Sequence, residues 1–182
     1  ITVVTWTFDD GNGNTETANQ TITVTDNTNP TIATLTAISV NADAGTCTYA
    51  SSQLTAPTAS DNCSTVTVTR SPASLAKGAN TVTWTATDGA GLTATSTQTV
   101  TVIDTQVPTI SCPATATANT NNDGTGNCTT TVLLGSPSAF DNCTTAGNFT
   151  FIAKVGGATI NPLTYLFGTG NTIVVWTATD QN

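Results

Sequence analysis

Residues 80–102 alternate apolar side chains with threonines in two runs that are separated by a glycine-containing turn. In the first run Val82, Trp84 and Ala86 occupy one side, and threonines occupy the other. In the second run the even positions continue the less polar side: Leu92, Ala94, Ser96, Val100 and Val102. Alternation with a period of two is typical of a half-buried β-strand, and a glycine-rich break between two such runs indicates a hairpin. We therefore predict two antiparallel strands joined by a turn at 88–91.

The hairpin pattern recurs in the chain, which indicates an array of repeats. It opens the chain at 3–24, with Trp6 in the place of Trp84, and its first half returns near the end with Trp176. The three tryptophans could be platforms on which sugar rings stack. Their regular position on the apolar side of a strand favours a structural role, so we predict that all three lie in the core.

The composition supports an all-β chain. Of the 182 residues, 46 are threonine, a β-branched residue suited to pleated sheets, and no helical periodicity of apolar residues is visible. The 3 Lys+Arg against 11 Asp+Glu give a formal net charge of −8. This excludes a basic surface for nucleic acid and disfavours contact with an anionic membrane. The sequence has no long apolar run for membrane insertion. It begins at Ile1 without Met or a targeting signal, so we expect a segment of a longer protein.

Alignment of the repeats predicts three parts. Residues 1–26 are the closing hairpin of a preceding repeat, 27–104 a complete repeat, and 105–182 a second repeat that lacks its last strand. The junctions are short and contain proline, which predicts a semi-rigid rod. The second repeat has extra residues between Cys143 and Trp176, where we expect an extended hairpin or loop. Short strands at this spacing are typical of an antiparallel sandwich.

Each full repeat combines short motifs at matching places. They are Asp61-Asn62-Cys63 and Asp141-Asn142-Cys143, Trp84-Thr85-Ala86-Thr87-Asp88 and Trp176-Thr177-Ala178-Thr179-Asp180, and Ile110-Ser111-Cys112-Pro113. The set resembles the hyalin repeat, or HYR domain, over nearly the whole chain. The resemblance implies tandem immunoglobulin/fibronectin III-like antiparallel β-sandwiches in an extracellular protein of adhesion or of multi-domain stalks. The threonine-rich array is also similar to large cell-surface proteins of Bacteroidota-type bacteria.

Five cysteines in a chain without histidine favour disulfides, because zinc sites and cysteine nucleophiles usually need a histidine partner. We predict that Cys47 pairs with Cys63 and that Cys128 pairs with Cys143. Each pair would close a loop of about 15 residues and contribute roughly 3 kcal/mol. Cys112 is then unpaired in this segment. The similarity to hyalin-type repeats implies a partner for Cys112 in a final strand, a little beyond Asn182.

Asp61 and Asp141 recur at the same point of each repeat. An acidic pair of this kind could act as in glycosidases. Recurrence favours a structural role instead, since Asp side chains cap turns by accepting hydrogen bonds from nearby backbone N–H groups.

The loop at 9–16 is a weak calcium candidate. Asp10, Asn12, Asn14 and Glu16 space oxygen ligands somewhat as a calcium loop does, but Thr15 stands where an EF-hand requires glycine. A hairpin turn is the favoured interpretation. We expect no other cofactor.

These features predict a non-enzymatic, extracellular structural or adhesive protein: a tandem-repeat stalk or a filament-forming segment. Its expected partners are neighbouring repeats and other copies of itself, through threonine rows that carry few guarding charges. Two alternatives stay open. The chain could be a carbohydrate- or surface-binding module that uses residues 144–170, or an accessory domain of a secreted enzyme.

Overall fold

The computed structural model describes residues 1–120, 126 and 128–180. Strands and one short 3-10 turn make up its regular structure, and the described residues contain no α-helix, which confirms the all-β prediction. No helix that could cross a membrane occurs in this part of the chain. The strands are β1 (Thr2–Asp9), β2 (Thr15–Ile22), β3 (Thr31–Ile32), β4 (Ile38–Asn41), β5 (Thr48–Ala50), β6 (Ala59–Ser60), β7 (Thr67–Ser71), β8 (Ser74–Ala76), β9 (Gly78–Thr87), β10 (Thr93–Ile103), β11 (Thr109–Ser111), β12 (Thr129–Thr131), β13 (Ser138–Phe140), β14 (Thr150–Val155), β15 (Ala158–Ile160), β16 (Leu166–Gly168) and β17 (Val175–Thr179).

The chain divides into two compact units. The first contains residues 1–37, 51–73 and 81–99, and the second contains 38–50, 74–80 and 100–182. Three segments of the first predicted repeat, 38–50, 74–80 and 100–104, therefore group with the second predicted repeat. The domain boundaries derived from the sequence stay a prediction.

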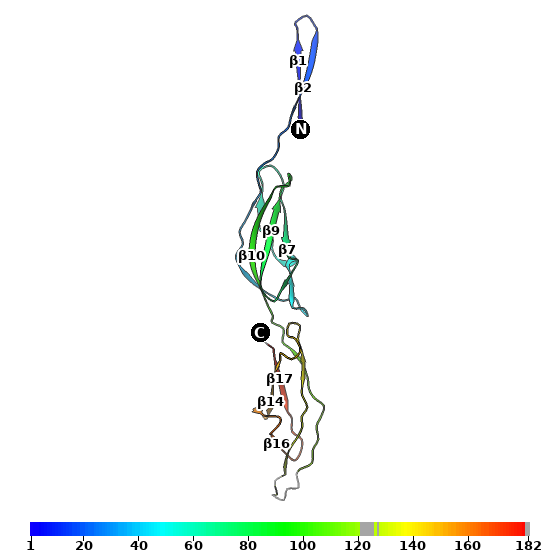
Figure 1. Cartoon of the computed structure of the whole chain (residues 1–182), viewed down its shortest axis with the longest axis vertical. Helices are drawn as coiled ribbons and strands as arrows, with labels where there is room; N and C mark the ends of the chain where they lie inside the picture. Colours follow the sequence, from blue (N-terminus) through cyan, green and yellow to red (C-terminus); the bar gives the residue numbers. More distant parts are fainter. Residues whose placement is uncertain (121–125, 127, 181–182) are drawn as a thin grey trace. The chain divides into compact units, whose positions relative to one another are not determined.

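The N-terminal hairpin forms as the sequence predicts. β1 and β2 pair antiparallel from Thr2↔Ile22 to Asp9↔Thr15, and they form a sheet of two strands (Figure 1). The prediction that Trp6 lies in a core is wrong, because its side chain is 61% exposed. A two-stranded ribbon has no second layer to cover an apolar face. The Trp6 indole instead donates a hydrogen bond from Nε1 to Gln20 Oε1, at 3.0 Å.

The sheet around Trp84 has four strands in the order β4-β10-β9-β7. β7 pairs antiparallel with β9, and the neighbouring strands β7, β9 and β10 are visible in Figure 1. β4 runs parallel to β10, so the sheet is mixed, whereas the sequence predicted antiparallel strands throughout. A parallel pair is possible here because a long stretch of chain separates the two strands.

The predicted alternation on β9 and β10 is confirmed. Val82, Trp84 and Ala86 are buried with 0% exposure on β9, and Val100 and Val102 are buried on β10. The facing threonines are less buried, as the period of two requires. The hydrophobic core of the Trp84 sheet therefore follows from the pattern at 80–102.

Residues 109–179 contain smaller sheets: β11-β13, β12-β16 and β15-β14-β17. β14 and β15 form the hairpin expected between Cys143 and Trp176, turning at Gly156 and Gly157, which both have positive φ. Ala153 and Phe167 are buried, while Trp176 on β17 is only half-buried. The prediction that Trp176 lies in the core is thus only partly correct, because water still reaches its side chain.

Candidate metal centres and the disulfide

Three aspartates from distant parts of the sequence meet in the first unit, and we call them the first cluster: Asp26, Asp61 and Asp88. Asp26 lies between β2 and β3, Asp61 directly follows β6, and Asp88 directly follows β9. One carboxylate oxygen from each lies within 4.8 Å of the others. Ionised carboxylates this close together repel one another.

Each carboxylate of the first cluster is oriented by the backbone that follows it. One oxygen accepts N–H groups two to four residues ahead. The bonds are Thr28 N to Asp26 Oδ1 (3.1 Å), Cys63 N and Ser64 N to Asp61 Oδ2 (2.9 and 3.0 Å), and Ala90 N and Leu92 N to Asp88 Oδ1 (2.9 and 2.8 Å). The other oxygen is buried without a hydrogen-bond partner in all three: Asp26 Oδ2, Asp61 Oδ1 and Asp88 Oδ2. Asp88 as a residue is only 7% exposed.

The hydrogen bonds around Asp61 favour its charged form. The pKa of Asp61 is lowered, first by the hydrogen bond from Cys63 N–H and also by that from Ser64 N–H, although partial loss of hydration opposes this. The pKa of the neighbouring Cys63 thiol is raised, first by partial loss of hydration and then by the charges of Asp26, Asp61 and Asp88. This thiol, though exposed, is therefore held toward its protonated, less reactive form.

A second cluster of the same kind lies in the second unit and consists of Asp104, Asp141 and Asp180. They directly follow β10, β13 and β17, and one oxygen from each lies within 4.8 Å of the others. Asp141 is 5% exposed. Its Oδ2 accepts the N–H groups of Cys143 (2.8 Å) and Thr144 (3.0 Å), and its Oδ1 is buried without a partner.

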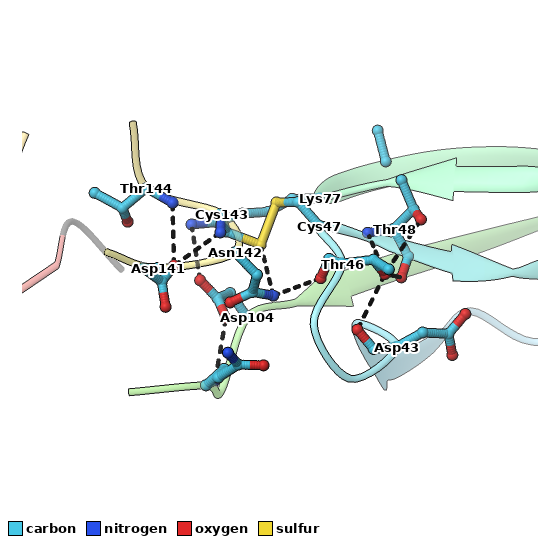
Figure 2. Close-up of a disulfide and its surroundings, with 12 residues drawn as sticks. Asp43, Thr46, Cys47, Thr48, Lys77, Asp104, Asp141, Asn142, Cys143 and Thr144 are labelled. Carbon is cyan, nitrogen blue, oxygen red and sulfur yellow. Dashed lines mark hydrogen bonds and ion pairs between the residues drawn. A yellow bond between two sulfur atoms is a disulfide. The ribbon is translucent and has the colours of Figure 1, made fainter. Parts of the chain in front are cut away.

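Asp104 differs in having a cation beside it. Its Oδ1 accepts Gln106 N–H at 3.1 Å, and its Oδ2 lies 3.9 Å from Lys77 Nζ (Figure 2). The amide oxygen Asn142 Oδ1, next to Asp141 in sequence, is also buried without a partner. Lys77 therefore partly neutralises the negative charge of the second cluster. Asn142 Oδ1 adds an uncharged oxygen next to Asp141 in the sequence.

The two clusters occupy equivalent positions of the two predicted repeats. Asp26 and Asp104 stand four residues before a junction proline, Asp61 and Asp141 begin the Asp-Asn-Cys motif, and Asp88 and Asp180 stand four residues after a tryptophan. The sequence singled out Asp61 and Asp141, and their predicted role as turn caps is confirmed by their backbone hydrogen bonds. It missed their four companions. Matching offsets in both repeats were the signal that could have found them.

The predicted calcium loop at 9–16 forms the favoured hairpin turn. Asp10 Oδ1 accepts N–H groups of Asn12 (2.8 Å) and Asn14 (3.2 Å), and Asp10 Oδ2 accepts Asn14 Nδ2–H (2.7 Å). These bonds lower the pKa of Asp10, the Asn14 side chain most. Glu16 lies in β2 opposite Phe8. Both oxygens of Asp10 are thus engaged inside its own loop.

Asp10 is the structural equivalent of Asp88. Asp10 N–H donates to Asn14 O and Asp88 N–H donates to Leu92 O, both at 3.1 Å, so the same turn closes the two hairpins. The difference lies in the second carboxylate oxygen, which bonds to Asn14 in one turn and has no hydrogen bond in the other.

The disulfide joins Cys47 to Cys143, with Cα atoms 4.8 Å apart (Figure 2). Cys63, Cys112 and Cys128 are free and exposed. The predicted pairs Cys47–Cys63 and Cys128–Cys143 are therefore wrong.

The local contacts explain the observed pairing. Asn142 Nδ2 donates to Thr46 O, which places the Asp-Asn-Cys turn of 141–143 against the residue before Cys47. The backbone of Cys47 is also held in place: Cys47 O accepts a hydrogen bond from Lys77 N–H at 3.2 Å, next to the paired strands β5 and β8. Cys63 is held elsewhere, in the turn that Asp61 caps. The disulfide links the first predicted repeat to the second, and loop length alone could not reveal this.

Cys112 is free in the described chain, as expected for this segment. It lies on a groove lined in part by Val132, Phe167 and Trp176. The partner implied for it by the hyalin-type resemblance stays a prediction.

Comparisons with protein-family models and with curated proteins found no match to this chain.

Proposed function

We propose that the chain is a non-enzymatic structural or adhesive segment of an extracellular protein, built from tandem immunoglobulin/fibronectin III-like sandwiches that resemble hyalin repeats. Its work is mechanical: the repeats form part of a stalk or of a filament. The all-β fold and the low content of charged residues agree with this proposal.

The observation that carries the proposal is the disulfide between Cys47 and Cys143. It joins residues 96 positions apart, one in each predicted repeat. Disulfides persist in oxidising compartments, which supports an extracellular location. A covalent link across a junction also prevents the enclosed chain from extending under tension. Such a link suits a protein that transmits force along its length.

Single-molecule force spectroscopy tests the mechanical role. The chain is pulled from its two ends, first oxidised and then in the presence of a reductant. At about 3.5 Å per residue, the disulfide hides roughly 340 Å of extension, so the reduced chain should lengthen by that amount. The variant Cys112→Ser is the control, because Cys112 takes no part in the link. Extension of the oxidised chain to its full length at low force would contradict the proposal.

A groove in the second unit favours a second candidate, a carbohydrate- or surface-binding module. Phe151, Leu163 and the half-buried Trp176 line it together with Leu133. Aromatic side chains at an accessible groove can stack on sugar rings. A glycan-binding screen of the chain and of Trp176→Ala tests this candidate. Binding that the substitution abolishes would support it, and the absence of any glycan ligand would count against it.

A further inference from the structure

We propose that each aspartate cluster is a calcium site, one formed by Asp26, Asp61 and Asp88 and the other by Asp104, Asp141 and Asp180. The inference goes beyond the mechanical role and does not depend on it. It rests on three observations: carboxylate oxygens that converge in both clusters, buried carboxylate oxygens that lack hydrogen bonds, and the recurrence of such an oxygen at the equivalent positions Asp61 and Asp141.

The spacing of the oxygens suits calcium. Calcium takes oxygen ligands at about 2.3–2.6 Å, so two oxygens on one ion can be up to about 5 Å apart. The oxygens of each cluster lie within 4.8 Å of one another. Magnesium binds at about 2.0–2.1 Å, demands near-octahedral geometry and gives up its waters reluctantly, so a site that offers several protein carboxylates favours calcium. Carboxylates are the hard, anionic donors that calcium prefers.

Independent support comes from the buried oxygens. Asp88 and Asp141 are both more than nine-tenths buried, and each has one oxygen without a hydrogen-bond partner. Buried polar atoms are normally satisfied, and a carboxylate oxygen that is not needs a compensating group. The backbone bonds to the other oxygen fix each carboxylate in advance. A cation bound to the free oxygens would satisfy them and cancel the repulsion among three charges.

The two sites should differ in affinity. Lys77 Nζ lies 3.9 Å from Asp104 Oδ2 and already supplies positive charge to the second cluster. A calcium ion there must displace or share this contact, so the second site binds more weakly than the first. Asn142 Oδ1, buried and without a partner, is an additional oxygen in the same turn as Asp141.

Calcium would tie together segments that the sequence keeps far apart. In the first cluster the ion connects the chain before β3 with the turns that follow β6 and β9. In the second it connects the end of β10 with the turn that follows β13 and with the end of β17. Each ion thus anchors one proline-containing junction segment to the end of the sandwich that we propose.

Equilibrium dialysis with radioactive calcium tests the proposal on the whole chain. At millimolar free calcium, the range typical of extracellular modules, we expect two ions per chain. Asp88→Asn and Asp141→Asn should each bind one ion, since Asn keeps the oxygen that accepts the backbone bonds and removes the charge. The matched control is Asp10→Asn, which changes the equivalent turn outside both clusters and should still bind two ions. Lys77→Met should bind two ions and tighten the weaker site several-fold.

Thermal unfolding shows whether a variant has lost its calcium site or has failed to fold. In a calcium chelator, Asp88→Asn should unfold at the same temperature as the unsubstituted chain or higher, because one repelling charge is gone. Calcium should raise the thermal unfolding midpoint of the unsubstituted chain by several degrees. In Asp88→Asn, calcium should leave unchanged the midpoint of the transition in which the first cluster unfolds. Two ions retained by both variants, or no calcium bound by the unsubstituted chain, would overturn the proposal. Neither result would affect the force measurement that tests the mechanical role.

Discussion

Trp84 and Trp176 lie in the same five-residue motif, Trp-Thr-Ala-Thr-Asp, yet their surroundings differ. Trp84 is fully buried on β9, a strand with hydrogen-bonded neighbours on both edges, β10 and β7. Trp176 is half-buried on β17, which within the described residues pairs on one edge only, with β14. The motif therefore decides which side of the strand a tryptophan occupies. The strands beside it decide how much water reaches the ring.

Trp6 extends the comparison to a third environment. It shares with Trp84 an indole N–H donated to a glutamine fourteen residues ahead: Gln20 for Trp6 and Gln98 for Trp84. The bond to Gln98 is buried, and Gln98 Nε2 donates in turn to Thr36 O at 3.1 Å. The bond to Gln20 is exposed. The same Trp–Gln hydrogen bond therefore occurs once exposed to water and once buried. Equivalent substitutions at the two places can be compared directly.

The largest expected effect is that of truncating the buried tryptophan. Trp84→Ala should lower the free energy of unfolding by about 3–5 kcal/mol, because it removes the largest fully buried side chain and leaves a cavity. Trp6→Ala, the matched control, should change it by less than about 1 kcal/mol, since the ring is already mostly in water. Urea denaturation of both variants measures the difference. Equal losses of unfolding free energy in the two variants would show that the exposure of the tryptophan does not determine its contribution to stability.

Removal of the disulfide should have the next largest effect. Cys47→Ser combined with Cys143→Ser should lower the free energy of unfolding by about 2–5 kcal/mol, because the loop that the bond closes is long. The loss should affect the transition of the second unit, to which both cysteines belong. Calorimetry under non-reducing conditions measures it, with Cys63→Ser as the control that should leave the transitions in place. A Cys63→Ser effect as large as that of the double variant would indicate a different pairing.

The buried glutamine should matter more than its exposed counterpart. Gln98→Ala leaves the Trp84 indole N–H and Thr36 O without their partner inside the protein, at a cost of about 1–3 kcal/mol. Gln20→Ala exposes the Trp6 N–H to water, which replaces the lost bond, so the change should stay within about 0.5 kcal/mol. Denaturant midpoints compare the two. A loss of stability in Gln20→Ala as large as that in Gln98→Ala would contradict the view that burial decides the cost of losing this hydrogen bond.

The sequence predicted those features that depend on neighbours in the chain. The alternation at 82–86 predicted the buried face of β9, and the glycine-containing turn predicted the hairpin at 1–26. The extra residues between Cys143 and Trp176 predicted a hairpin or loop, which is the hairpin of β14 and β15. It failed where distant residues meet. The partner of Cys47 was set by Asn142, which contacts Thr46 across the fold, rather than by the shortest loop. The aspartate clusters likewise combine residues from three segments each, so no single window of sequence contains either one.

The smallest expected effect concerns the N-terminal hairpin at low pH. Hydrogen bonds from Asn14 and Asn12 lower the pKa of Asp10 below its ordinary value of 3.8. A lowered pKa means that the charged form is favoured in the folded turn, so this contribution is fully present above pH 3.8 and is lost as the pH falls through the folded pKa. Amide NMR signals of Asn12 and Asn14 should therefore shift together in a titration below pH 4, while the fully exposed site leaves overall stability almost unchanged. In Asp10→Asn this titration should vanish, because the amide keeps an acceptor and has no proton to gain. A titration of these signals that persists in the variant would show that Asp10 is not its source.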